Sequence, residues 1–107
     1  MQCNKGDIVL IKFPFTTLSR SKKRPVLVIK SENEYHDFVC FQITSKKAQI
    51  NVLNIQLSDL HTGDLKLISY VKYDKCFTLN TELVDKKLAC VNEVFLAQVQ
   101  KLFCDDL

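Results

Sequence analysis

Two continuous apolar runs near the N-terminus constrain the fold of this chain more than any other feature. Residues 8–11 (IVLI) and 26–29 (VLVI) contain only aliphatic side chains, most of them β-branched. An apolar run without polar alternation predicts a strand that is buried on both faces. The segment between them, residues 16–23, is polar and basic and is predicted to be a loop. The chain is therefore expected to begin with two buried strands.

Further short strands are predicted up to residue 91, at 38–43, 51–57, 69–77 and 86–91. In the second of these, Leu53, Ile55 and Leu57 alternate with Asn54 and Gln56, so the three apolar side chains should share one face. Residues 61–64, which include one of the two glycines, are predicted to form a turn.

The hydrophobic period changes after Asn92. Asn92 is a favourable helix cap, and the apolar side chains that follow recur at helical spacing: Phe95, Val99, Leu102 and Phe103. A helix that docks on the sheet is therefore predicted. Short strands and one terminal helix indicate a mainly β single domain, residues 1–107, built as a strongly bent antiparallel sheet or small open barrel.

Composition excludes several classes of protein. The net charge of +3 over 107 residues is mildly basic, which favours an anionic partner without indicating a nucleic-acid tail. The five cysteines lack the spacing of a zinc site, so we expect reduced thiols, no metal and no cofactor. No apolar run approaches the length that spans a bilayer, which predicts a cytoplasmic protein without a membrane partner.

Arg24 is the first candidate functional residue. Pro25 fixes the backbone beside it, so Arg24 is presented at the start of the second strand in an extended conformation. A guanidinium held there is suited to grip a phosphate. The nearby cations Arg20, Lys22 and Lys23 are suited to contact an RNA backbone. The alternative is a solvated basic loop.

Thr44 and Ser45 end the third predicted strand and are followed by Lys46 and Lys47. Two hydroxyls and two ammonium groups at a strand end are suited to hold a phosphate or a sugar oxygen. The alternative is a turn in which the hydroxyls bind loop backbone groups.

Tyr70, Lys72 and Asp74 alternate with Val71 and Tyr73, so they should share one face of a strand. Lys72 and Asp74 would lie about 6–7 Å apart, close enough to exchange protons with one small centre. Tyr70 could stack on a base. The alternative is a salt bridge on a wet sheet face.

The three groups together match one reaction. Cleavage of RNA through its own 2′-hydroxyl requires removal of a proton, stabilisation of charge on phosphorus and a proton for the leaving 5′-oxygen. Arg24 could stabilise the charge, Thr44 could hold the phosphate, and Lys72 with Asp74 could transfer protons. This reaction needs neither a metal nor a protein nucleophile.

Four motifs in order resemble the PemK/MazF-like toxins: GDIVL with FPFT, KKRPVLVI, FVCFQITS and SYVKYDKCFTL. The resemblance implies an SH3-like barrel of the MazF type that acts as a homodimeric, metal-independent endoribonuclease on single-stranded RNA. It also implies products with 2′,3′-cyclic phosphate and 5′-hydroxyl ends, a partner antitoxin of the MazE/PemI type, and operator DNA as a ligand of the pair.

The resemblance assigns roles to individual residues. Arg24 corresponds to the arginine of the family's Arg-Pro motif, Thr44 to its partner threonine and Asp74 to an acid proposed as a base in some members. Lys72 stands where several members have arginine, and Arg20 where many have a small residue.

Two other functions remain open on the sequence alone. The chain could be a non-catalytic barrel that binds an antitoxin, DNA or a gyrase-type target, or a general nucleic-acid-binding domain of the same fold.

Overall fold

The computed structural model of the protein describes residues 2–12, 23–46 and 50–107. Three of the predicted RNA-binding residues, Arg20, Lys22 and Lys47, lie outside the described residues, as does most of the predicted loop at 16–23.

The described strands form one antiparallel sheet in the spatial order β4-β6-β3-β2-β1-β7-β5. They are β1 (Asp7–Lys12), β2 (Lys23–Lys30), β3 (Asp37–Thr44), β4 (Val52–Ile55), β5 (Leu60–Gly63), β6 (Ser69–Asn80) and β7 (Val84–Val91). Two 3-10 turns, η1 (Leu57–Asp59) and η2 (Thr81–Leu83), precede β5 and β7, and the helix α1 (Glu93–Asp105) follows β7.

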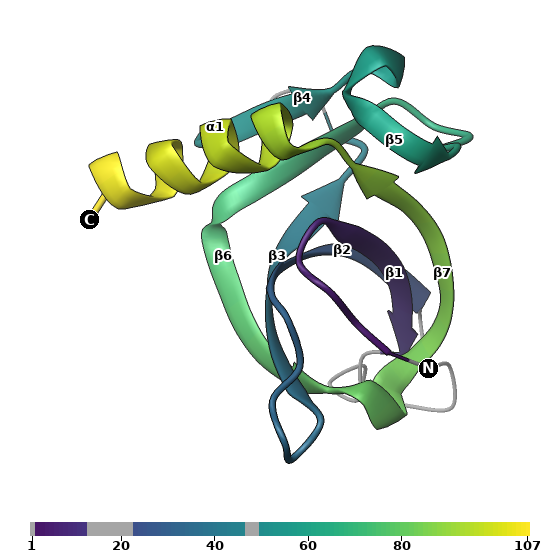
Figure 1. Cartoon of the computed structure of the whole chain (residues 1–107). Helices are drawn as coiled ribbons and strands as arrows, with labels where there is room; N and C mark the ends of the chain where they lie inside the picture. The colour runs from purple at the N-terminus through teal and green to yellow at the C-terminus, as the bar shows by residue number, and fades with distance from the viewer. Residues whose placement is uncertain (1, 13–22, 47–49) are drawn as a thin grey trace.

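The sheet is strongly curled. Figure 1 shows β6 and β7 bowing around β1, β2 and β3, while α1 lies across one end beside β4 and β6. Shifts of register cause much of this bending, because an extra residue in one strand bends that strand locally. Such shifts occur between β1 and β7, between β2 and β3, and between β3 and β6. The predicted fold, a mainly β and strongly bent antiparallel sheet with a C-terminal helix, is confirmed.

Two hydrophobic clusters explain the two continuous apolar runs. In β1, Ile8 belongs to the cluster beneath the helix, while Val9 and Ile11 belong to the other cluster. In β2, Leu27 faces the first cluster and its neighbour Val26 faces the second. Because successive side chains on a strand point to opposite faces, a strand with a core on both sides must be apolar at every position.

The helix begins and packs as predicted. The side-chain oxygen of Asn92 accepts a hydrogen bond from the backbone N–H of Phe95 at 2.8 Å, which caps the first turn. Phe95 and Val99 are buried in the cluster beneath the helix. The ring of Phe103 lies 5.1 Å from that of Phe41 on β3, measured between centroids. The apolar stripe of the helix therefore holds it against the sheet.

Two local predictions were wrong. Leu57 does not join the core with Leu53 and Ile55, because β4 ends at Ile55 and Leu57 begins the turn η1, where its side chain is 75% exposed. Residues 61–63 are not a turn: they belong to β5, in which Thr62 and Gly63 pair with β7. The hydrogen bonds of an edge strand outweighed the local preference of glycine for a turn.

Candidate functional site

Pro25 ends the pairing between β2 and β3. Pro25 lies opposite Leu10 of β1, and this pair cannot exchange two N–H···O bonds because proline has no N–H. The nitrogen of Pro25 therefore points toward β3, where it has no hydrogen to donate. The pairing of β2 with β3 accordingly extends only as far as Val26 and Gln42. The last two residues of β3 are thus left at an open end of the ladder.

Arg24 and Thr44 occupy this open end. Val26 pairs with Gln42 and Leu27 with Phe41, so continuing the register by two residues places Arg24 opposite Thr44. On the other side of β3, Thr44 pairs with Tyr70 of β6. Side chains at opposed positions share a face, with Cβ atoms about 5 Å apart. Thr44 and Tyr70 are therefore paired neighbours, and Arg24 lies on the next strand, beyond the last paired residues of β2 and β3.

A cavity of about 440 Å³ lies at the same end of the sheet. The segment after β5 and the strand β7 form its far side. The cavity is lined by five residues that the sequence predicted for catalysis or RNA binding, namely Lys23, Arg24, Thr44, Ser45 and Lys46. This volume falls within the range of about 300–1,000 Å³ that is typical of ligand sites.

The hydroxyl of Thr44 is partly used within the protein. Its Oγ1 accepts a hydrogen bond from the backbone N–H of Lys46 at 3.2 Å, which is the turn that the alternative interpretation predicted. A hydroxyl has one proton to donate as well as two lone pairs. Thr44 can therefore stabilise its turn and still donate its proton to a phosphate oxygen in the cavity.

Lys23 is the one predicted cation of the cavity that forms an ion pair within the described residues. Its Nζ lies 3.2 Å from Oδ2 of Asp85 on β7, and both side chains are partly exposed. This pair links the start of β2 to β7 and neutralises part of the charge of Lys23.

Three charged residues of the cavity were missed by sequence reasoning. Lys86 comes from β7, where it pairs with Leu10, and Asp64 and Lys66 come from the segment between β5 and β6. Their positions depend on which strands neighbour one another in the curled sheet. No motif in the sequence marks them.

Tyr70, Lys72 and Asp74 do not line this cavity. Lys72 pairs with Gln42 on one side and with Val52 on the other. It lies two residues further along β6 than Tyr70, away from the open end. Asp74 lies where the register jumps, because Phe41 pairs with Cys76 while its neighbour Gln42 pairs with Lys72. The side chain of Asp74 is exposed.

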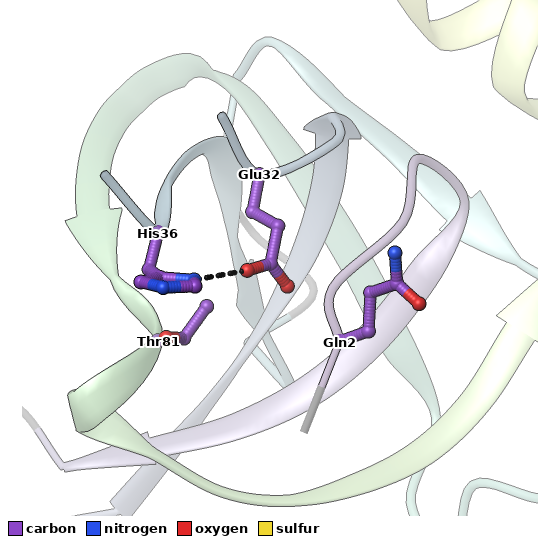
Figure 2. Close-up of a pocket in the computed structure, with 4 residues that line it drawn as sticks. All are labelled: Gln2, Glu32, His36 and Thr81. Carbon is purple, nitrogen blue, oxygen red and sulfur yellow. Dashed lines mark hydrogen bonds and ion pairs between the residues drawn. The ribbon is translucent and has the colours of Figure 1, made fainter. Parts of the chain in front are cut away.

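A second pocket lies at the N-terminal segment, lined by Gln2, Glu32, His36 and Thr81 (Figure 2). Nδ1 of His36 is 2.8 Å from Oε2 of Glu32, and the other oxygen of Glu32 accepts the backbone N–H of Cys3. The hydrogen bonds from His36 and from Cys3, in that order, lower the pKa of Glu32. Glu32 thus ties the N-terminal segment to the turn before β3. None of the four residues that line this pocket was predicted to be functional.

Within the described ranges, no three histidine, cysteine or acidic side chains are grouped to hold a metal ion. No helix in the described part of the chain is long and apolar enough to cross a membrane.

The chain is similar to one family over nearly all of its length. The family of PemK-like, MazF-like toxins of type II toxin–antitoxin systems matches residues 4–105. No curated protein matches the chain in sequence.

Solved structures show the same fold at low sequence identity. An endoribonuclease from mycobacterial species, solved in complex with its cognate antitoxin, is 16% identical with a TM-score of 0.75, and the likeness covers 96% of this chain and 92% of that one. MazF from Deinococcus radiodurans is 18% identical with a TM-score of 0.72, over 98% of this chain and 96% of that one. The curled sheet with one terminal helix is therefore the MazF fold, as the resemblance implied.

Proposed function

Because the chain belongs to the PemK-like, MazF-like toxins of type II toxin–antitoxin systems, we propose that it is an endoribonuclease that cleaves single-stranded RNA without a metal. The family match carries this proposal. It is supported by the cavity that gathers Arg24, Thr44, Ser45 and Lys46 at one end of the sheet.

In the proposed reaction the 2′-hydroxyl of the RNA loses its proton and attacks the adjacent phosphorus. The bond from phosphorus to the 5′-oxygen breaks, and that oxygen takes up a proton. The products carry a 2′,3′-cyclic phosphate and a 5′-hydroxyl. Negative charge builds on the phosphate oxygens as the attack proceeds, so fixed donors aimed at those oxygens accelerate the step.

Arg24 is the residue best suited to that charge. Its guanidinium presents a planar set of charged donors that matches two phosphate oxygens. Thr44, which lines the same cavity as Arg24, donates its hydroxyl proton to the same phosphate. Ser45 and Lys46 bind the RNA backbone next to this phosphate and hold it in position.

The proposed reaction also requires two proton transfers, one from the 2′-hydroxyl and one to the leaving 5′-oxygen. We propose that Lys72 and Asp74 assist these transfers, and that Tyr70, which pairs with Thr44, stacks on a base beside the reacting phosphate. Lys72→Ala and Asp74→Ala test these roles: a residue that moves the proton should change the pH dependence of cleavage as well as its rate.

We propose further that the protein acts in the cytoplasm as a homodimer and is held inactive by a cognate antitoxin, with which it binds operator DNA. One structurally similar endoribonuclease was solved with its antitoxin bound. Light scattering of the purified protein tests the dimer, since a monomer at micromolar concentration would rule out a site shared by two subunits.

The decisive experiment is cleavage of a mixed-sequence single-stranded RNA in excess EDTA by the purified protein and three variants. Arg24→Ala should reduce the rate at least about 10²-fold, as loss of a donor to the transition state does. Arg24→Lys should recover part of it. Lys101→Ala, which removes one exposed cation from α1, should leave the rate unchanged.

A folded wild-type protein that does not cut the RNA would contradict the endoribonuclease proposal and favour a non-catalytic barrel that binds its antitoxin, DNA or a gyrase-type target. Cleavage by Arg24→Ala at the wild-type rate would leave an endoribonuclease whose catalytic centre lies elsewhere.

A further inference from the structure

The segment of residues 64–68, between β5 and β6, forms one wall of the cavity and is held at both ends. At its start, Gly63 has φ +82° and packs against β7 so closely that a Cβ there would overlap the Leu88 carbonyl and lie 2.6 Å from Cα of Ala89. At its end, the hydroxyl of the buried Ser69 donates to the carbonyl of Leu67 at 3.0 Å. The two ends of the wall are therefore anchored to strands of the sheet.

Asp64 is the one carboxylate among the described residues that line this cavity. Five cations share the lining with it: Lys23, Arg24, Lys46, Lys66 and Lys86. Oδ1 of Asp64 accepts the backbone N–H of Leu65 at 2.8 Å, and within the described ranges Asp64 forms no ion pair. Asp64 therefore shares the cavity with five cations but pairs with none of them, so its other oxygen is available to a ligand.

A carboxylate is an unfavourable neighbour for the RNA backbone, because it repels phosphate. It is a favourable neighbour for a base, because an ionised carboxylate only accepts hydrogen bonds and base amino groups only donate them. The cavity also presents the apolar side chains that the flat face of a base requires, among them Leu65 and Leu67 of the same wall. Unpaired bases are read on their Watson–Crick edges in this way.

We infer that Asp64 is a specificity-determining residue: it selects, at one position next to the cleaved bond, a base that carries an amino group on its Watson–Crick edge. Adenine, cytosine and guanine have such a group. Uracil has none: its one Watson–Crick donor is N3–H, and the two carbonyl oxygens that flank this N–H would repel the carboxylate. This inference rests on the proposed RNA-cleaving function and adds to it what the site recognises.

The test compares Asp64→Asn with Glu34→Gln, which removes the same charge from an exposed residue outside the cavity. The amide oxygen of asparagine can still accept the Leu65 N–H, so the wall should be preserved. Cleavage of a randomised single-stranded RNA would be sequenced at the cut sites for the wild type and both variants.

The wild type should prefer an amino-bearing base over uracil at one position by about 10-fold or more, the discrimination that a good side-chain–base contact provides. Asp64→Asn, which can donate as well as accept, should reduce this preference to below about threefold. Glu34→Gln should keep the wild-type distribution. An unchanged distribution in Asp64→Asn, an equal shift in both variants, or a wild-type preference for uracil would each overturn the inference.

A binding measurement separates this inference from the proposed activity. Short oligonucleotides with a 2′-deoxy sugar at the cut position lack the nucleophile, and their affinities can be compared for each base in turn. Base-selective binding that is lost in Asp64→Asn, in a protein that does not cleave, would support the inference and refute the proposed activity. If no base changes the affinity of the wild type, the inference is wrong even where cleavage occurs.

Discussion

Asp7 at the start of β1 and Lys87 on β7 form an ion pair whose carboxylate is almost completely buried. Nζ of Lys87 lies 2.9 Å from Oδ1 of Asp7, and the Asp7 side chain is only 3% exposed. Its other oxygen accepts the backbone N–H of Asn4 at 2.9 Å. One carboxylate thus joins β1, β7 and the N-terminal segment.

Asp7→Ala should lower the free energy of unfolding by about 1–3 kcal/mol, because it leaves the Asn4 N–H and the Lys87 ammonium without their acceptor. Urea unfolding followed by circular dichroism would measure the change. Asp85→Ala removes the partner of Lys23 in a more exposed pair and should cost no more than about 1 kcal/mol. If both variants lose the same free energy of unfolding, burial of Asp7 does not strengthen its interactions.

Gly63→Ala should destabilise the protein more than Gly6→Ala. Both glycines have a positive φ, which costs an alanine about 1–2 kcal/mol. A Cβ at position 6 would meet its neighbours at 3.5 Å or more, whereas at position 63 it would overlap the backbone of β7. Thermal unfolding of both variants gives the comparison, and a smaller loss for Gly63→Ala would contradict the close packing of β5 on β7.

Thr44→Val should reduce RNA cleavage by about 10²-fold, because valine keeps the shape of threonine but cannot donate a proton to the phosphate. Thr44→Ser keeps the hydroxyl and should retain most of the activity. Single-turnover cleavage rates would separate this effect from a change in RNA binding. If the valine and serine variants cleave equally, the hydroxyl serves only the turn to Lys46.

Glu32→Gln should make the protein less sensitive to acid. The hydrogen bonds from His36 and Cys3 lower the pKa of Glu32 in the folded state. Their stabilising effect is therefore complete above the unfolded pKa of about 4.3 and is lost as the pH falls through the lower folded value.

The urea midpoint of the wild type should accordingly fall further between pH 7 and pH 3 than that of Glu32→Gln. Glu34→Gln, at an exposed position in the same turn, is the control. A wild type and a Glu32→Gln variant that lose the same stability on acidification would contradict the role of this pair.

The sheet and the helix could be predicted because their signals are local. An apolar residue at every position of 8–11 and 26–29 requires a core on both faces, and two clusters on opposite faces of the sheet meet that requirement. The cap at Asn92 and the stripe from Phe95 to Phe103 depend only on residues within one helix. The position of Arg24 likewise follows from the adjacent proline.

The parts that could not be predicted depend on which segments become neighbours. Leu57 continues the alternation of Leu53 and Ile55 in the sequence, but β4 ends before it. Gly63 favours a turn locally, but pairing with Ala89 makes it part of a strand. Asp64 and Lys86 reach the cavity only because β5 and β1 flank β7 on opposite sides, and no local pattern contains that information.

The proline at position 25 has a consequence for how this surface could change. Any other residue there would supply a backbone N–H toward β3, and the carbonyl of Ile43 would be its natural acceptor. The two strands could then pair further along their length, and the space between Arg24 and Thr44 would become ordinary sheet. One missing hydrogen atom therefore ends the β2–β3 pairing at Val26, and replacing Pro25 would let this pairing extend toward Arg24 and Thr44 without altering any side chain assigned to RNA.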